Sequence, residues 1–129
     1  PLLRPPVKEA LGGTMQIDPA TRRNLELTTS LSGGRDGSLI AAIDRTVTAA
    51  GGRLLEQRLS APSCDLALID ARHEALEYTV TENRFRTEIR DALRNVPDLD
   101  RALSRLALDR GGPRALAAIR NGLTRVMML

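Results

Sequence analysis

An apolar stripe with helical spacing is the feature of this sequence that most constrains its fold. Its members stand three, four, three and four residues apart, and they are Leu66, Ile69, His73, Leu76 and Val80. This spacing places them on one face of an amphipathic α-helix, whereas a strand would require strict alternation. The stripe therefore predicts a helix over residues 66–80 that is opened by Ser63 or Asp65.

Five further apolar stripes predict helices on both sides of this one. Ser38, Thr48 and Asn83 are placed to cap three of them, and Pro113 stands at the first position of the last. The stripes are Leu39, Ile40, Ile43 and Val47; Leu54, Leu55 and Leu59; Phe85, Ile89, Leu93 and Val96; Leu99, Leu103 and Leu106; and Leu116, Ile119, Leu123 and Val126. The connections are short, so neighbouring helices are expected to be antiparallel or sharply bent.

The N-terminal part is less regular. Residues 1–13 contain three prolines and end in Gly-Gly, which is typical of a linker. Residues 14–17 could form a short strand, Asp18 caps a short helix that starts at Pro19, and residues 25–29 fit either strand or helix. The predicted fold class is thus mainly α: an array of antiparallel amphipathic helices with a small irregular or short-stranded N-terminal part.

Composition excludes several kinds of chemistry. The single cysteine, Cys64, and the single histidine, His73, cannot build a zinc site without carboxylates. The single lysine, Lys8, follows no glycine-rich turn, so a P-loop is excluded and we expect the chain neither to bind nor to hydrolyse ATP. No apolar run approaches the roughly 18 residues of a membrane helix. The formal net charge of +3 is a mild bias that permits nucleic-acid contact without arguing for it.

Arg86, Arg90 and Arg94 repeat every four residues and therefore line one face of their predicted helix. Such a strip could contact DNA phosphates, because phosphate contacts require clustered basic residues. The commoner case for such a strip is a solvated face opposite Phe85, Ile89 and Leu93. Both interpretations stay open at this point.

Three other features favour a structural role over a functional one. His73 is expected to be packed or half-buried on the inner face of its helix. Asp98 and Asp100 point to different helix faces, and Asp98 suits the first turn of a helix. The pair Gly51 and Gly52 falls in a predicted first helical turn, which indicates that the backbone of a neighbouring element approaches closely there.

Four stretches together resemble the MutS family of DNA mismatch-repair ATPases. They are residues 15–27, 38–55, 98–108 and 112–120, and their order and separations match the start of the family's core, or lever, domain. The positions that carry the resemblance are Asp18, Arg22, Arg23, Asn24, Thr46, Thr48, Gly51, Arg53, Leu54, Leu55, Asp98, Leu99, Arg101, Arg105 and Leu106. Family members usually have Ser at the position of Gly52 and Trp near Arg58, so packing there is expected to differ.

The resemblance implies a division into two parts. Residues 1–13 would be a linker or the tail of a preceding connector domain, and residues 14–129 the N-terminal part of a helical core domain. The mismatch-reading domain would precede Pro1, and the clamp and ATPase domains would follow Leu129. The final apolar residues 126–129 have no capping residue after them, which also leads us to expect a larger fold.

The function implied by the resemblance is structural and signal-transmitting. The core connects the ATPase end to the clamp that closes around DNA, so no catalytic, cofactor or metal residue is expected in this chain. ATP and Mg²⁺ would belong to the ATPase domain of the parent protein. The implied partners are the connector, clamp and ATPase domains, mismatched duplex DNA and a second copy in a homodimer. The implied location is the bacterial cytoplasm, at the nucleoid.

Two other classes of function remain open on the residues alone. One is a stand-alone helical nucleic-acid-binding module that uses the arginine face. The other is a helical protein-interaction module without a nucleic-acid partner. DNA affinity that falls with added salt would favour the first of these.

Overall fold

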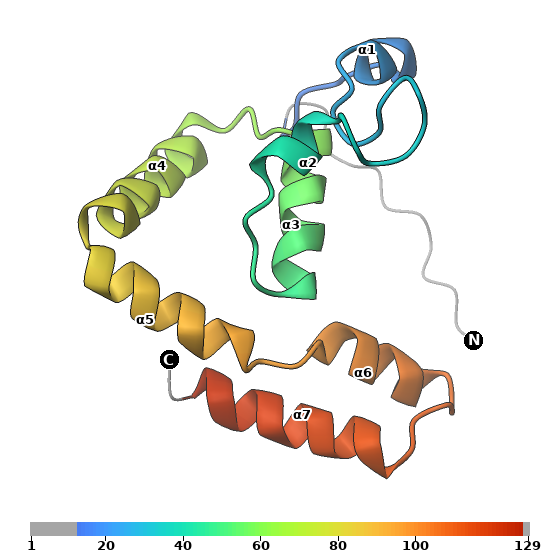
Figure 1. Ribbon diagram of the computed structural model, residues 1–129, viewed down its shortest axis with the longest axis vertical. Coiled ribbons are helices and arrows are strands. Elements are labelled where there is room, and N and C mark those ends of the chain that lie inside the picture. The colour runs from blue at the N-terminus through green and yellow to red at the C-terminus, as the bar shows by residue number, and fades with distance from the viewer. Residues whose placement is uncertain (1–12, 128–129) are drawn as a thin grey trace.

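The computed structural model describes residues 13–127, which contain seven helices (Figure 1). The mainly α fold class is confirmed. The predicted linker, residues 1–13, lies outside the described residues except for Gly13. The helices are α1 Pro19–Asn24, α2 Leu39–Ile43, α3 Ala49–Ser60, α4 Leu66–Thr81, α5 Asn83–Arg94, α6 Leu99–Ala107 and α7 Pro113–Val126.

Side-chain caps start most of these helices where the sequence predicts them. The Asp18 carboxylate accepts from the backbone N–H groups of Ala20 and Thr21, and Ser38 Oγ accepts from that of Ala41. Thr48 and Asp65 cap α3 and α4 in the same way. Each cap satisfies N–H groups that have no partner inside the helix, which is why these residue types mark helix starts.

Two predicted boundaries are wrong. Asn83 is the first residue of α5 rather than its cap, and Glu82 stands at the cap position without a side-chain hydrogen bond. Helix α2 ends at Ile43, so Val47 falls outside it, because the carboxylate of Asp44 binds the backbone N–H of Thr46 and turns the chain. Helix α5 ends at Arg94 with Asn95 at its C-cap, so Val96, the last residue of its predicted stripe, lies just beyond the helix.

The segment before α1 contains one β-bridge and no strand within the described residues. Thr14 pairs with Ser63 in antiparallel fashion, and the N–H of Met15 donates to the carbonyl of Pro62 at 2.8 Å. The chain then turns into the cap at Asp18, so the pairing stops after one bridge. The predicted short strand over 14–17 is therefore reduced to this single bridge.

Residues 25–29 form neither of the two predicted structures. They run irregularly against the start of α2, where the carbonyls of Glu26 and Leu27 accept from the N–H groups of Leu39 and Ile40 at 2.8 and 3.0 Å. This contact buries Leu27 and Ile40, and the side chain of Ile40 is only 1% exposed. A small core thus forms between the 25–29 segment and α2.

Helices α6 and α7 form an antiparallel hairpin (Figure 1). Ala102 of α6 and Gly122 of α7 are buried in it. A Cβ atom on Gly122 would overlap the end of the Leu99 side chain, and it would lie 3.0 Å from Leu99 Cγ and 3.2 Å from Pro97 Cγ. A larger residue at this position would therefore require the Leu99 side chain to move.

Helices α4 and α5 meet at a corner instead of packing side by side (Figure 1). The rings of Tyr78 and Phe85 face each other edge-on across this corner, with centroids 5.3 Å apart. The α4 stripe is largely uncovered, since Leu66, Leu76 and Val80 are 74%, 60% and 66% exposed. The expectation of a packed or half-buried His73 is consequently wrong, because the stripe on which it lies faces outward and His73 is exposed.

The expectation of close backbone approach at Gly51 and Gly52 is also wrong. The atoms nearest to an added Cβ are side-chain atoms of the turn before α3, namely Thr48 Oγ1 at 3.0 Å from Gly51 and Thr46 Oγ1 at 3.4 Å from Gly52. The crowding at this helix start is therefore local, and it comes from the residues that cap and precede α3. Close approaches of another element occur at Gly122 and at Gly111 instead, and at Gly111 an added Cβ would lie 2.9 Å from the Cα of Leu106 in α6.

Candidate functional site at the junction of α3 and α6

A two-pronged ion pair joins α3 to the start of α6, although its partners are 45 positions apart. Arg53 Nη1 donates to Asp98 Oδ2 at 2.9 Å, and Arg53 Nη2 donates to Asp98 Oδ1 at 2.8 Å. The same Nη2 lies 3.4 Å from Asp100 Oδ2. Because a bidentate guanidinium–carboxylate pair fixes orientation as well as distance, it holds the two helices in one relative placement.

Asp98 also starts α6. Its Oδ1 accepts from the backbone N–H of Arg101 at 3.2 Å, which makes it the N-cap residue. The hydrogen bond from Arg53 and then the backbone hydrogen bond from Arg101 lower the pKa of Asp98 to about 2. The same pairing raises the pKa of Arg53. One carboxylate thus links a helix start to a distant helix and stays ionised down to strongly acidic pH.

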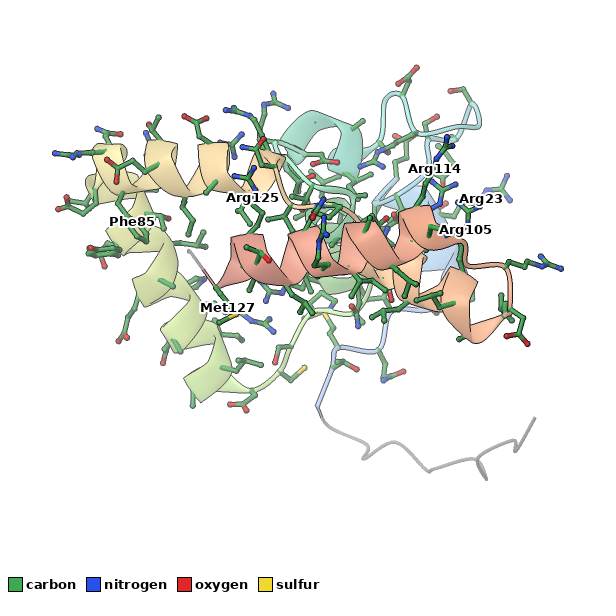
Figure 2. The ribbon with its side chains drawn as sticks, turned by 90° about the horizontal axis from the view of Figure 1, so that it is seen from below. Arg23, Phe85, Arg105, Arg114, Arg125 and Met127 are labelled. Carbon is green, nitrogen blue, oxygen red and sulfur yellow. The ribbon has the colours of Figure 1, made fainter. Side chains whose placement is uncertain are left out.

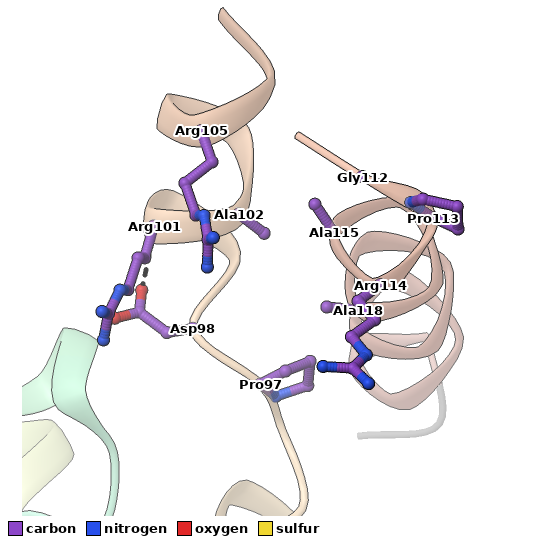
Figure 3. Close-up of a pocket in the computed structure, with 10 residues that line it drawn as sticks. All are labelled: Pro97, Asp98, Arg101, Ala102, Arg105, Gly112, Pro113, Arg114, Ala115 and Ala118. Carbon is purple, nitrogen blue, oxygen red and sulfur yellow. Dashed lines mark hydrogen bonds between the residues drawn. The ribbon is translucent and has the colours of Figure 1, made fainter. Parts of the chain in front are cut away.

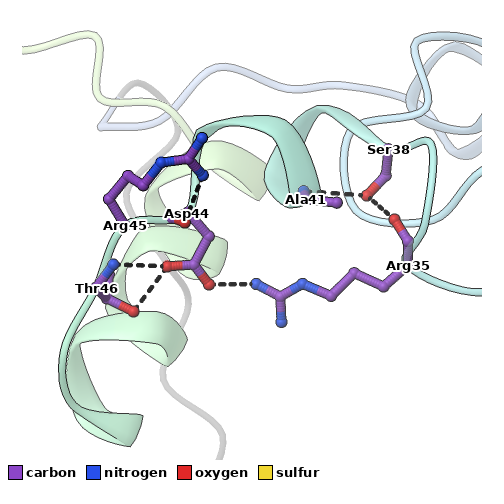
Figure 4. Close-up of polar contacts among 6 residues, drawn as sticks. All are labelled: Arg35, Ser38, Ala41, Asp44, Arg45 and Thr46. Carbon is purple, nitrogen blue, oxygen red and sulfur yellow. Dashed lines mark hydrogen bonds and ion pairs between the residues drawn. The ribbon is translucent and has the colours of Figure 1, made fainter.

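A second polar cluster lies around Asp44, between α2 and α3 (Figure 4). Asp44 Oδ1 accepts from the backbone N and from Oγ1 of Thr46 at 2.9 and 2.7 Å, and Arg35 Nη2 donates to Oδ2 at 2.5 Å. These contacts, led by the backbone hydrogen bond of Thr46, lower the pKa of Asp44. Next to it, the carbonyl of Arg45 accepts from Arg90 Nη2 at 2.9 Å, so α5 is tied to this turn.

The predicted arginine strip is distributed over three structural roles. Arg86 donates to the carbonyls of Thr79 and Val80 at 3.2 and 3.1 Å and to Asn83, so it binds the carbonyls near the end of α4. Arg90 binds the Asp44 turn as described, and Arg94 pairs with Asp91 on its own helix. These contacts favour a structural role for the three arginines, and contact with DNA phosphates stays a prediction.

A different set of arginines lines a hollow of about 740 Å³ between α6 and α7. In Figure 3, Arg105 and Arg114 extend into the space between the two helices, whereas Arg101 is turned toward α3. Arg101 and Arg105 come from α6, and Arg114 comes from the first turn of α7. Within residues 13–127 their guanidinium groups have no hydrogen bond or ion pair, so they differ from Arg53 and from the predicted strip. We call this the basic hollow; it is lined by Pro97, Asp98, Arg101, Ala102, Arg105, Gly112, Pro113, Arg114, Ala115 and Ala118.

The structure brings together two of the three groups of residues that carry the resemblance to MutS. The group at α3, which includes Arg53, meets the group at α6, which includes Asp98, Arg101 and Arg105. The group at α1 stays apart: in the described part of the chain, no hydrogen bond joins Arg22 or Arg23 to the junction. The remaining members are Asp18 and Asn24 at α1, Thr46, Thr48, Gly51, Leu54 and Leu55 at α3, and Leu99 and Leu106 at α6.

Sequence reasoning missed two parts of this site. The Arg53–Asp98 pair could not be predicted, because no local pattern indicates which distant carboxylate an arginine will meet. The sequence did contain a signal for part of the basic hollow: Arg101 and Arg105 stand one helical turn apart and therefore on one face of their helix. That Arg114 joins them depends on the hairpin, which the sequence indicated only through a short connection.

Residues 13–127 contain no cluster of three or more histidine, cysteine, aspartate or glutamate side chains that could hold a metal ion. Asp98 and Asp100, the nearest approach to a carboxylate pair, are bound by Arg53. In the same part of the chain, no helix has the length and apolar character needed to cross a bilayer.

The fold and the junction define a helical structural domain whose elements are joined by ion pairs. Comparison with known families identifies it further, because the sequence model of MutS domain III matches residues 20–129. The chain belongs to the MutS domain III family. The resemblance stated above from its residues is confirmed.

Curated relatives agree with this assignment. The chain is 69% identical over 124 residues to the DNA mismatch repair protein MutS of Paracoccus denitrificans, which covers 96% of this chain and 14% of that protein. It is 67% identical over 123 residues to that of Cereibacter sphaeroides, covering 95% and 14%, and 63% identical over 129 residues to that of Dinoroseobacter shibae, covering 100% and 15%. The chain thus spans only about one seventh of these relatives.

Proposed function

We propose that this chain is the N-terminal part of the core, or lever, domain of a DNA mismatch-repair protein and that its role is mechanical. It would carry conformational change between an ATPase domain and a clamp that holds DNA. The match to MutS domain III over residues 20–129 supports the first part of this proposal. The observation that supports the second part is the bidentate pair between Arg53 and Asp98.

Transmission of movement requires elements that move together. The Arg53 guanidinium fixes α3 to the first turn of α6, because two parallel hydrogen bonds resist both separation and rotation. Helix α6 is in turn packed on α7 through Gly122, where Leu99 and Pro97 leave no space. A displacement of α3 would therefore be passed to the α6–α7 hairpin as a unit.

The chemistry would lie in other parts of the parent protein. ATP and Mg²⁺ would be bound by an ATPase domain outside this chain, and this chain would supply no catalytic, cofactor or metal residue. The partners would be the connector, clamp and ATPase domains, mismatched duplex DNA and a second copy of the protein. The site of action would be the cytoplasm, at the nucleoid.

The test uses the full-length protein encoded by the same gene. We expect Arg53→Gln to leave mismatch affinity nearly unchanged and to slow ATP-triggered release from mismatched DNA by about 10-fold, the usual size of a coupling between sites. Arg58→Gln is the matched control, since Arg58 is an exposed residue of the same helix. Release kinetics are followed by fluorescence anisotropy of labelled mismatched DNA.

A charge swap tests whether the ion pair itself, and not either residue alone, is needed for fast release. Arg53→Asp combined with Asp98→Arg restores an ion pair across the junction, and we expect it to recover part of the release rate that each single change removes. Release at the wild-type rate in Arg53→Gln would contradict the mechanical role. Equal slowing in Arg58→Gln would contradict it as well.

A further inference from the structure

We infer that the junction of α3 and α6 has two paired positions, and that the Arg53 guanidinium passes from the carboxylate of Asp98 to that of Asp100 when the helices shift. The structure shows the first position, in which Arg53 binds Asp98 with two hydrogen bonds. This inference rests on the proposed function, because it names the movement that a lever domain would make here. The two helices would change their relative placement without losing the link between them.

Asp100 lies within reach as a second acceptor. Arg53 Nη2 is 2.8 Å from Asp98 Oδ1 and 3.4 Å from Asp100 Oδ2, so one nitrogen faces both carboxylates. A shortening of the longer distance by about 0.5 Å would bring it to the usual length of a hydrogen bond. Within the described residues the Asp100 carboxylate has no other ion pair or hydrogen bond, and the side chain is 77% exposed. It is therefore available to accept from Arg53.

Asp98 would keep two partners after Arg53 has moved. Its Oδ1 accepts from the backbone N–H of Arg101 at 3.2 Å, a contact inside α6 that does not depend on α3. The Arg101 side chain is turned toward α3 (Figure 3). The hydrogen bond from Arg53 is the first cause of the lowered pKa of Asp98, the backbone N–H of Arg101 is the second, and the charge of the Arg101 side chain also contributes. The exchange would thus leave neither carboxylate without a favourable contact.

The exposure of the three side chains keeps the two positions close in free energy. Asp98 is 22%, Arg53 48% and Asp100 77% exposed, so all of them are in contact with water in the first position. An ion pair that is open to solvent changes an equilibrium by only about 5-fold or less. A modest preference of a neighbouring domain for one placement of α3 would therefore suffice to move the joint.

The movement has a direction and a size. Asp98 is the N-cap of α6 and Asp100 is the second residue of the helix, so passing from one to the other corresponds to roughly 3 Å along its axis. Within residues 13–127, the hydrogen bonds between α3 and α6 are those of Arg53, so no other hydrogen bond between them opposes the shift. Small helix shifts of this kind are a common form of conformational change.

Helix α7 would move together with α6. The two helices form an antiparallel hairpin, and Figure 2 shows the side chains of Arg105 and Arg114 together at the end remote from Met127. Within the hairpin, Gly122 leaves no room between α7 and the Leu99 side chain. The shift at Arg53 would consequently displace the hairpin as a whole relative to α3.

The first experiment follows ATP-triggered release of labelled mismatched DNA from the full-length protein. We expect Asp100→Asn to slow release by about 5-fold, because it removes the second acceptor and leaves the Arg53–Asp98 pair intact. Asp100→Glu restores a carboxylate and should recover most of the rate. The control Asp70→Asn removes one exposed charge from α4 and should change the rate by less than about 2-fold. Release at the wild-type rate in Asp100→Asn would overturn the inference.

A double-mutant cycle excludes a simpler role for Asp100. The residue lies in the first turn of α6, where a negative charge is favourable whatever Arg53 does. If Asp100 acts through Arg53, adding Asp100→Asn to Arg53→Gln should change the release rate by less than about 2-fold. Two effects that multiply in full would show that Asp100 serves the helix alone, and would overturn the inference.

Arginine side-chain ¹⁵N relaxation dispersion tests the exchange directly in this chain. Because helix shifts occur in microseconds to milliseconds, we expect an exchange contribution at Arg53 Nε that disappears in Asp100→Asn. Circular dichroism of the same samples shows whether the chain is helical; if it is not, the release cycle decides alone. A flat profile for Arg53 in helical wild-type chain would overturn the inference.

The proposed function and this inference fail in different ways. Slow release in Arg53→Gln together with wild-type release in Asp100→Asn would leave the mechanical role in place and make the junction a rigid link. Wild-type release in Arg53→Gln would contradict the mechanical role itself, and the two-position joint with it.

Discussion

The single carboxylate of Asp98 makes two different structural contacts. It begins α6 by accepting the N–H of Arg101, and it holds Arg53 of α3. Such shared use is possible because a carboxylate has two oxygens and can accept several hydrogen bonds at once. Its ionisation state therefore decides both the start of a helix and the placement of a distant one.

Acid is expected to release this junction. The pKa of Asp98 is lowered from 3.8 to about 2 by Arg53 and by the N–H of Arg101. A carboxylate whose pKa is lower in the folded chain stabilises the fold fully above its unfolded value and loses this contribution as the pH falls through its folded value. The junction should thus be complete above about pH 4 and weaken progressively towards pH 2.

Carbon-13 NMR of the aspartate carboxyl groups measures this titration directly. Replacing Arg53 by Gln removes the first cause of the shift, so the pKa of Asp98 should rise towards 3.8. Arg58→Gln on the same helix serves as the control and should leave the titration in place. An unchanged pKa of Asp98 in Arg53→Gln would mean that the ion pair does not form in solution.

At the scale of the elements, the sequence predicted where the helices lie but not which of their faces other elements cover. Periodicity identified six of the seven helices, and Asp18 with Pro19 identified the seventh. The stripe of α4 shows the limit of this reasoning. The spacing of Leu66, Leu76 and Val80 identifies the apolar face of the helix, but it contains no information about which element, if any, covers that face.

The glycines illustrate the same limit. The sequence drew attention to Gly51 and Gly52 because they are adjacent and begin a helix. Inside a helix, the glycine against which another segment packs is Gly122, a single residue of α7. A glycine in a helix interior is itself a signal, since it costs about 1 kcal/mol relative to alanine unless close packing requires it.

Gly122 should tolerate a side chain poorly, as should Gly111, where an added Cβ would lie 2.9 Å from the backbone Cα of Leu106. We expect Gly122→Val to destabilise the fold by about 2 kcal/mol, because its side chain would overlap Leu99 and press on Pro97. Denaturant unfolding followed by circular dichroism measures the change. Gly112→Ser is the control: nothing lies within 4 Å of a Cβ there, and serine suits an N-cap, so stability should stay equal or rise.

A double-mutant cycle of Gly122 and Leu99 tests whether steric overlap between these two positions causes the destabilisation. Leu99→Ala creates space next to residue 122, so it should cost clearly less in the Gly122→Val background than in wild type. Additive effects of the two changes would contradict the overlap and leave only the altered helix propensity as the explanation.

At the scale of the whole molecule, the burial is concentrated in few places. Among the described residues, the buried hydrophobic side chains are Leu27, Ile40 and Ala102. The helices between these points form an open arrangement in which α4 and α5 run along the outside (Figure 1). Polar links such as Arg53–Asp98 and Arg90 to the Arg45 carbonyl also join elements across this open arrangement.

This distribution predicts a sharp contrast between two apolar residues that the sequence placed on equivalent stripes. Ile40→Ala should destabilise the chain by about 2 to 4 kcal/mol, because it opens a cavity in a fully buried site. Leu76→Ala should change stability by less than about 0.5 kcal/mol, because Leu76 is already 60% exposed. Thermal or denaturant unfolding of both variants measures the contrast, and equal losses would show that the α4 stripe is covered in solution.

The double duty of Asp98 also has a consequence for how such chains can diverge over evolutionary time. A substitution at position 98 removes a helix cap and an inter-helix link in one step, whereas a substitution at position 53 removes the link alone. Asn or Ser at 98 would preserve the cap and tolerate the loss of Arg53, but few other residues could. Position 53 is therefore expected to vary more freely than position 98 among related chains.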